Sequence, residues 1–182
     1  YSMLVARVGL SGSVIWEKII GTPSWDQALC SASDADGNIY LSGYGQAIDT
    51  MDQDILLYKL DGNTGDSLFS KRIDAGYNDK GVYLDTMSGN NLLLISHSYK
   101  PSSDSVMSRV WKMNVDFDTL WTWMPCDSAE FEINCIFEDT FHRIVFSGKM
   151  LPDTGQVFRF WYGFLNDSGI FGWQLIHPPY FL

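Results

Sequence analysis

Short apolar runs alternate with polar turns along almost the whole chain. The runs are rich in β-branched and aromatic residues and are short, as in residues 54–60. Between them lie clusters of Gly, Asn and Asp that suit tight hairpins, at residues 34–38, 61–65, 88–91 and 166–169. No segment combines helical periodicity with helix start and stop signals. The pattern therefore predicts an all-β protein of short antiparallel strands.

An aromatic residue on the second arm of a hairpin recurs at an even spacing. The four markers, which are 53, 52 and 50 residues apart, are Trp16, Phe69, Trp121 and Phe171. Such strict recurrence indicates packing between repeated units rather than a carbohydrate-binding platform. The other tryptophans, which follow no single register, are better candidates for exposed contacts.

A second hairpin lies between these markers and shares their period. Its return strand ends in a serine at three places, Ser42, Ser96 and Ser147, which are 54 and 51 residues apart. Twelve residues before each serine stands an apolar residue, namely Cys30, Leu84 and Cys135. Two independent markers with one period of about 52 residues indicate a true internal repeat.

Two hairpins in each unit give four short strands, which is the pattern of β-propeller blades. The predicted fold is one β-propeller segment over residues 1–182, with about three and a half four-stranded antiparallel blades. It comprises the outer hairpin of a partial blade and three full blades, at 3–20, 27–73, 80–124 and 131–176. The partial blade lacks its inner hairpin, which must come from upstream, from a further stretch of chain or from a partner, because unpaired sheet edges promote aggregation.

The first full blade resembles the SBBP-type β-propeller repeat. The resemblance is carried by residues 54–61, by the Gly-rich turn and aromatic arm that follow, and by the strand at 37–44. It extends over the chain, with departures at 114–118 and 139–143, where other residues replace the Gly-containing turns. The resemblance implies a secreted or surface protein that serves as an interaction or structural module.

Residues 61–69 are also similar, more distantly, to the quinoprotein propeller repeat, with Phe69 in place of its tryptophan. Quinoprotein dehydrogenases additionally use a pair of adjacent cysteines, which this sequence lacks. This second resemblance therefore implies a shape rather than redox chemistry, and we expect no cofactor. A WD40 assignment fails because Trp25-Asp26 does not recur, and a kelch assignment fails because there is no Gly-Gly pair.

The formal charge of −10, from 12 basic and 22 acidic residues, makes nucleic acid and anionic membranes poor partners. No apolar run approaches the roughly 18 residues of a membrane helix, so we expect no membrane span. Three cysteines are too few for a disulfide-built scaffold. We expect Cys30 and Cys135 to be small buried hydrophobic residues, with a Cys126–Cys135 disulfide as the alternative.

Two turns alternate oxygen-bearing side chains and are candidate Ca²⁺ sites. The first comprises Asp34, Asp36 and Asn38, and the second comprises Asn114, Asp116 and Asp118. The competing interpretation is an ordinary hairpin turn in which Asp caps backbone amides. A complete calcium loop needs further carboxylates downstream, which residues 39–41 do not supply. The turn interpretation is therefore favoured.

One N-x-S/T sequon is present, at Asn166, and the turn prediction places it at the tip of an outer hairpin. A glycan would meet no steric obstacle there. Glycosylation would require a secretory route, which agrees with the extracellular or cell-surface location that the resemblance implies.

No catalytic motif is present, and His97, His142 and His177 share no metal-ligand spacing. A catalytic set could still be assembled from separate blades. The favoured function is a non-catalytic structural or protein-interaction module, with protein partners or additional propeller blades. The alternative is a glycan-binding or glycan-acting propeller domain that uses one face of the ring.

Overall fold

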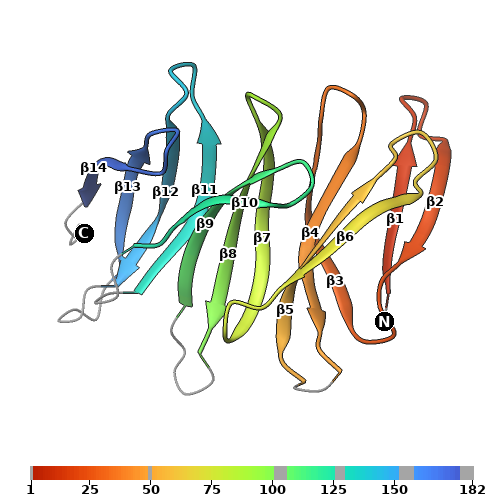
Figure 1. Cartoon of the computed structure of the whole chain (residues 1–182), viewed down its shortest axis with the longest axis horizontal. Coiled ribbons are helices and arrows are strands. Elements are labelled where there is room, and N and C mark those ends of the chain that lie inside the picture. Colours follow the sequence, from red (N-terminus) through yellow and green to blue (C-terminus); the bar gives the residue numbers. More distant parts are fainter. Residues whose placement is uncertain (1, 49–50, 101–105, 126–129, 152–157, 177–182) are drawn as a thin grey trace.

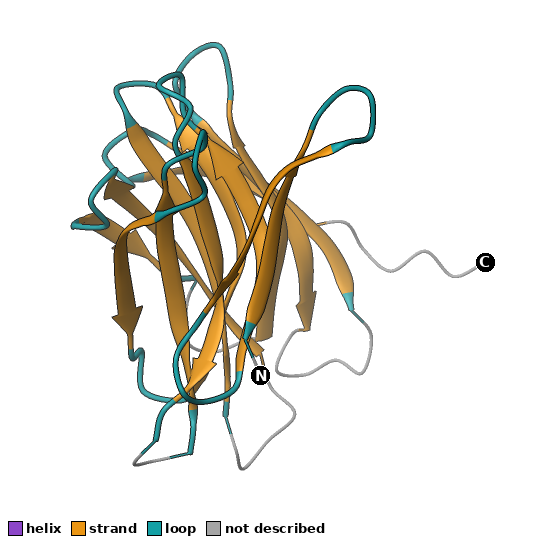
Figure 2. Ribbon diagram, turned by 90° about the vertical axis from the view of Figure 1, so that its right-hand side faces the viewer, coloured by secondary structure: helices purple, strands orange, loops and turns teal. Residues whose placement is uncertain are grey.

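A computed structural model describes residues 2–48, 51–100, 106–125, 130–151 and 158–176. Within these residues the chain forms strands and loops and no helix (Figure 2). The strands are β1 (Met3–Val8), β2 (Val14–Ile20), β3 (Asp26–Ser33), β4 (Ile39–Gln46), β5 (Gln53–Leu60), β6 (Ser67–Ile73), β7 (Asn78–Met87), β8 (Asn91–Tyr99), β9 (Val106–Asn114), β10 (Thr119–Trp123), β11 (Glu130–Glu138), β12 (Ile144–Leu151), β13 (Arg159–Leu165) and β14 (Phe171–Ile176).

Consecutive strands pair antiparallel in groups of four. The hairpin β1–β2 stands alone, and β3–β6, β7–β10 and β11–β14 each follow chain order. These units lie in a row, with β1–β2 at one end and β14 at the other (Figure 1). The prediction of an all-β, propeller-like segment with four-stranded antiparallel units is confirmed. We call β1–β2 the half-blade and the three following units the first, second and third full blades.

The second and third full blades are joined into one sheet by a single parallel pairing, between Phe131 of β11 and Met107 of β9. Apart from this pairing, the two blades pack face to face through a shared hydrophobic core, as the blades of a propeller do. The row is open over the described residues, because β1–β2 pairs with no further strand there.

The same irregularity recurs in the first strand of every full blade. A shift in pairing register falls between Ala28 and Cys30, between Gly81 and Tyr83, and between Ile133 and Cys135. One extra residue in a strand is a β-bulge, which strengthens the local twist. The bulges are 53 and 52 residues apart and show that the repeat is structural.

The bulges correct the alignment of the serine markers. Cys30 pairs with Ser42 and Cys135 pairs with Ser147, but in the second full blade Tyr83 pairs with Ile95. Ser96 is therefore one residue out of register with the other two serines. Ile95 holds the position of Ser42 and Ser147, 53 and 52 residues from them, and Ser96 was aligned with these residues because of its type.

The outer hairpins align through their third and fourth strands. The pairs at one register position are Arg7–Trp16, Lys59–Phe69, Lys112–Trp121 and Phe164–Trp173. The fourth aromatic marker is thus Trp173 and not Phe171, which pairs with Leu165. The same register shift occurs in all four outer hairpins, and Trp173 lies 52 residues after Trp121, in step with the earlier markers.

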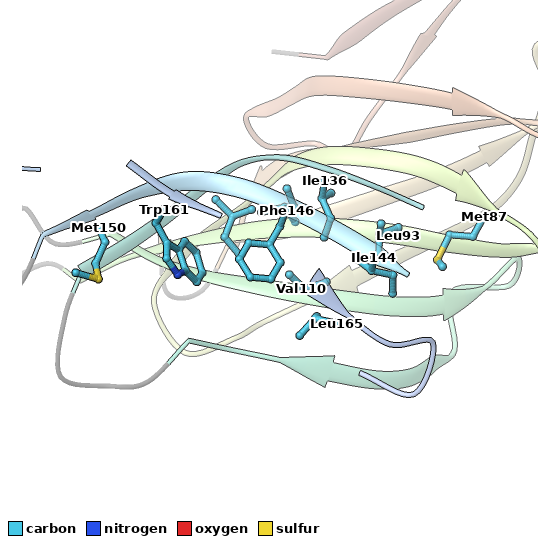
Figure 3. Close-up of a cluster of buried hydrophobic side chains, with 11 residues drawn as sticks. Met87, Leu93, Val110, Ile136, Ile144, Phe146, Met150, Trp161 and Leu165 are labelled. Carbon is cyan, nitrogen blue, oxygen red and sulfur yellow. The ribbon is translucent and has the colours of Figure 1, made fainter. Parts of the chain in front are cut away.

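Each neighbouring pair of units shares a hydrophobic core. One cluster lies between the half-blade and the first full blade and contains Met3, Leu56 and Leu60. A second lies between the first and second full blades, and a third between the second and third. In the third cluster Phe146 and Trp161 lie side by side, 4.6 Å between ring centroids (Figure 3). Stability therefore depends on contacts between neighbours, as in other repeat proteins.

Candidate interaction surface

The half-blade and the first and second full blades each reach the outer turn of the next blade with a basic side chain. Arg7 donates to the carbonyl of Gly62 at 2.6 Å. Lys59 pairs with Asp116 at 3.3 Å, and Lys112 pairs with Asp167. The three basic residues are 52 and 53 residues apart, so one contact is repeated along the row.

An aromatic side chain on the fourth strand contacts the same turn. The indole nitrogen of Trp16 donates to the Gly62 carbonyl at 3.0 Å, and that of Trp121 donates to the Asp167 carbonyl at 2.9 Å. A Cβ atom on Gly65 would lie 2.6 Å from the Trp16 ring, and one on Gly169 would lie 2.8 Å from the Trp121 ring. The tryptophans thus lie against glycines.

The contact between the first and second full blades is formed by residues of different size from those at the other two contacts. Phe69 occupies the tryptophan position and Phe117 the glycine position, and their rings stack with centroids 5.9 Å apart. Phe117 keeps the backbone of the glycines, with φ of 64° against 73° at Gly65. Positive φ is strained for a residue with a side chain. Phe69 is smaller than the tryptophan of the other contacts, and Phe117 is larger than their glycine. The total side-chain volume at this contact is therefore roughly conserved.

The half-blade exposes the face that every other unit buries. Counted from the Arg7 and Lys59 positions, Leu4 corresponds to Leu56 and Val8 to Leu60. Leu4 is 68% exposed and Leu56 5%, while Val8 is 57% exposed and Leu60 is fully buried. We call Leu4, Val8, Ile15 and Ile19, which are all exposed, the N-terminal end face.

The third full blade exposes the side that, in the other units, is covered by the unit that follows. Phe160 corresponds to Ile55 of the first full blade; Phe160 is 55% exposed, whereas Ile55 is buried. We call the exposed or half-buried residues on this side of the blade the C-terminal end face, which comprises Cys135, Phe137, Phe160, Tyr162 and Leu175. The two ends of the row are therefore two halves of one kind of interface.

The first predicted calcium site is a hydrogen-bonded turn. The Asp34 carboxylate accepts bonds from the Asn38 backbone and side chain and from the Tyr40 hydroxyl, each at 2.8 Å. Burial alone would raise the pKa of Asp34, but these hydrogen bonds outweigh it and hold the pKa below its ordinary value. Asp36 lies exposed in the same turn. Both Asp34 oxygens already have protein donors, and calcium binding there stays a prediction.

The second such turn is built in the same way. Oδ1 of Asn114 accepts from the amides of Asp116 and Asp118 at 3.0 and 2.8 Å. Asp116 is turned toward Lys59 of the preceding blade. Across the described part of the chain, no three His, Cys, Asp or Glu side chains gather as a metal site would require.

Asn166 lies exposed at an outer hairpin turn, where the sequon was predicted to be. Its Oδ1 accepts from the amides of Ser168 and Ile170 at 3.0 and 2.9 Å. These bonds use the side-chain oxygen, whereas a glycan would be attached to the side-chain nitrogen. Glycosylation is compatible with the turn and stays a prediction.

His142 meets Ser88 and Glu138 where the inner hairpins of the second and third full blades touch. Ser88 Oγ lies 3.1 Å from His142 Nδ1 and 2.6 Å from Glu138 Oε1, and Oε1 lies 2.8 Å from the same Nδ1. A catalytic triad needs serine and carboxylate on opposite nitrogens of the ring. The cluster therefore has the residue types of a triad without its geometry, and it connects two blades.

His97 is buried and its Nε2 lies 3.0 Å from the Ile133 carbonyl of the next blade. Burial lowers the pKa of His97, and the Ile133 carbonyl opposes this only in part. The ring is therefore neutral at pH 7 and donates to Ile133. His177 lies outside the described residues.

The cysteine predictions have different outcomes. Cys30 is partly buried and Cys135 is exposed, and both are free thiols. The expectation of a buried Cys135 was wrong, because no other strand among the described residues packs on its side of the third full blade. Burial raises the pKa of Cys30 to about 11. Cys126 lies outside the described residues.

Two buried aspartates that sequence analysis missed organise the linkers between blades. Asp26 accepts from the Thr22 amide and hydroxyl, and Asp79 accepts from the Ala75 amide at 2.7 Å and from the Ser98 hydroxyl. Burial raises the pKa of Asp79, although these hydrogen bonds oppose it. The spacing of 53 residues is a signal that could have found the pair in the sequence.

A hollow of about 550 Å³ is lined by residues of the first full blade and of the linkers before and after it. Its charged lining comprises Asp52, Asp54, Arg72 and Asp74. Arg72 pairs with Asp54 at 2.9 Å and donates to the Gly45 carbonyl at 3.2 Å. Arg72 of β6 thereby contacts both β4 and β5.

Among the described residues no helix is long and apolar enough to cross a membrane. No protein-family model matches the chain, and no curated protein matches it in sequence. A similar solved structure is that of a protein of unknown function from Bacteroides caccae, with a TM-score of 0.50 and 10% identity over 96% of this chain and 72% of that one. This likeness concerns the fold alone, and membership of the SBBP-type repeat family stays a prediction.

Proposed function

We propose that this chain is a non-catalytic structural or protein-interaction module that binds protein partners or further propeller blades through its two end faces. One observation carries the proposal. Leu4 and Val8 are exposed at positions where the first full blade buries Leu56 and Leu60. These residues share one face of the hairpin with the exposed Glu17, and exposed apolar patches mark interaction sites on soluble proteins.

The energetic argument follows from burial. Covering a large apolar side chain contributes about 1.5–3 kcal/mol. Four such residues form the N-terminal end face, and the free edge of β1 adds unpaired backbone groups over the described residues. A partner that supplies both an apolar surface and a strand would satisfy both needs.

An extracellular or cell-surface location belongs to the same proposal. The exposed Asn166 sequon supports it, since a glycan there would lie on an outer turn. The acidic charge of −10 favours protein or glycan partners over nucleic acid.

Glycan binding is the second candidate, and one feature favours it. Phe158, Phe160 and Tyr162 alternate along and just before β13, with the first two 49% and 55% exposed. Alternate residues of a strand point to the same face, so these rings form a row. Binding of an oligosaccharide that is lost in Phe160→Ala, while Leu4→Glu still binds, would favour this candidate over the first.

Hydroxyl-radical footprinting of the protein as its host produces it tests the main proposal. Ile19 on the N-terminal end face and Ile48 in a loop are 77% and 74% exposed, so the same residue type is compared at nearly equal exposure. We expect Ile19 and Leu4 to be oxidised severalfold less than Ile48 in the native protein. Equal oxidation of Ile19 and Ile48 would show that nothing covers the end face and would overturn the proposal.

A further inference from the structure

We infer that the N-terminal end face of one chain binds the C-terminal end face of a second copy of the same chain, head to tail. The inference rests on the proposed function, because it names the partner of the end faces. Three contact rules observed between neighbouring units of the row carry it.

The first rule concerns apolar burial. The Val8 position is buried in every full blade by the unit that precedes it, at Leu60, Met113 and Leu165, and the Leu4 position is buried in the first and third full blades, at Leu56 and Trp161. The Phe160 and Tyr162 positions are covered in the other blades by the unit that follows, as at Ile55 and Val110. The two end faces are therefore the two complementary sides of one repeated interface.

The second rule concerns size at the outer turn. Gly12, Gly65 and Gly169 hold the same turn position and share positive φ values of 83°, 73° and 76°. A Cβ on Gly65 or Gly169 would collide with a tryptophan of the preceding unit, whereas a Cβ on Gly12 meets nothing within 4 Å. The space over Gly12 matches the space that tryptophan fills elsewhere. In the last blade, the residue at the register position of Trp16 and Trp121 is Trp173.

The third rule concerns charge, and it separates a second copy from an arbitrary partner. Inside the row a basic residue faces an oxygen acceptor, as Lys112 faces Asp167. At the C-terminal end Phe164 stands at the Lys112 position, so this end presents no basic residue there. At the N-terminal end the turn at residues 9–13 carries no carboxylate, since Leu10 stands at the Asp167 position and Ser11 at the position of Asp116, which pairs with Lys59. An aspartate in this turn opposite Phe164 would be desolvated without a partner. The uncharged turn at one end therefore fits the uncharged Phe164 position at the other.

Such a contact joins different surfaces of the two copies. It is therefore heterologous, and it either closes into a ring or propagates. The measured mass of the assembly decides which of these forms is present.

The test uses charge exchange, read by sedimentation velocity and native mass spectrometry over a dilution series. Wild-type chain is expected to associate, and Leu10→Asp or Phe164→Lys alone to weaken self-association at least tenfold. An equimolar mixture of the two variants recreates the Asp–Lys pair of the internal contacts, so hetero-association should recover to near the wild-type level. Leu10 is fully exposed, so its substitution leaves the fold intact. Circular dichroism checks the Phe164→Lys chain, since Phe164 contacts Gly172 and Arg143.

A second measurement needs no variant. Footprinting of wild type should show Leu4, Ile19 and Phe160 becoming protected together as the concentration rises, while Ile48 stays constant. A chain that stays monomeric up to the order of 1 mM, or a mixture that fails to recover association, overturns the inference. If Leu4 and Ile19 are nevertheless protected in the native protein, a different partner covers them and the proposed function stands.

Discussion

The indole nitrogen of Trp16 donates a 3.0 Å hydrogen bond to the carbonyl of Gly62, 46 residues further along the chain and in the next blade. Trp121 makes the same bond to the Asp167 carbonyl, again 46 residues away. A contact that repeats with the period of the sequence connects each unit to the next. The row is therefore held by nearest-neighbour interfaces, and its stability is expected to be close to the sum of such terms.

Substitution of Gly65 by alanine tests the packing of Trp16 on the outer turn. Gly65→Ala adds a Cβ 2.6 Å from the Trp16 ring and also strains a backbone with φ of 73°. We expect a loss of about 2–4 kcal/mol in the free energy of unfolding, from strain of about 1 kcal/mol and overpacking of 1–3 kcal/mol. Urea denaturation measures this loss.

Gly12→Ala is the matched control for that substitution. Gly12 has φ of 83°, and a Cβ added there would have nothing within 4 Å, so only the backbone term of about 1 kcal/mol applies. The comparison is made at high dilution, where copies of the chain are separate. Equal losses for the two variants would mean that Trp16 does not restrict Gly65.

A double substitution tests the contact between Phe69 and Phe117. Phe117→Gly removes a fully buried ring at a cost of about 3–5 kcal/mol, partly offset by relief of positive φ. Phe69→Trp alone adds volume beside Phe117 and is also destabilising. The double variant recreates the tryptophan-over-glycine contact of the other two interfaces. We expect a favourable coupling of about 1–3 kcal/mol in a double-mutant cycle, and strict additivity would contradict the size rule.

Much of the fold follows from the sequence, because it depends on local signals. Turn residues such as Asp34 and Gly37 and the period of the aromatic markers were enough to predict four-stranded antiparallel units. The register within a unit was harder. Ser96 was aligned with Ser42 because both are serines, although Ile95 holds the register position of Ser42. Matching residue types between degenerate repeats can be wrong by one residue, and the strand pairing fixes the register.

The candidate surface could not be predicted residue by residue. Leu4 and Leu56 are both leucines in β-rich segments, and only the arrangement of the units makes one exposed and the other buried. The basic residues were within reach, since Arg7, Lys59 and Lys112 recur with the repeat. Their acceptors vary between Gly62, Asp116 and Asp167 in type and offset, and this hides the pairing in a single sequence.

His97 gives the protein a pH dependence with a definite sign. Burial lowers the pKa of His97 in the folded chain below the ordinary value of 6.5. The unfolded chain therefore binds a proton first as the pH falls, and stability contributed by the neutral ring is lost below about pH 6.5. We expect the unfolding midpoint in urea to fall between pH 7.5 and pH 5.5, and His97→Gln to reduce that slope. A glutamine can still donate to the Ile133 carbonyl, so an unchanged slope would exclude His97 as its source.

The two described cysteines should differ in reactivity. The thiolate is the reactive form, and burial raises the pKa of Cys30 to about 11, whereas Cys135 is exposed on the C-terminal end face. At high dilution, where copies of the chain are separate, we expect iodoacetamide at pH 8 to modify Cys135 at least tenfold faster than Cys30. Peptide mapping by mass spectrometry separates the two sites, and labelling in urea should abolish the difference.

The Cys135→Ser variant shows whether the slow reaction of Cys30 belongs to its own surroundings. Cys30 lies at the contact between the first and second full blades, with its sulfur 3.9 Å from the Gly81 carbonyl. Its labelling should therefore stay slow in the variant and accelerate as the pH approaches 11, because the thiolate population grows. Fast labelling of Cys30 at pH 8 in the folded variant would mean that this contact opens readily. The blades would then be less firmly packed than the buried clusters indicate.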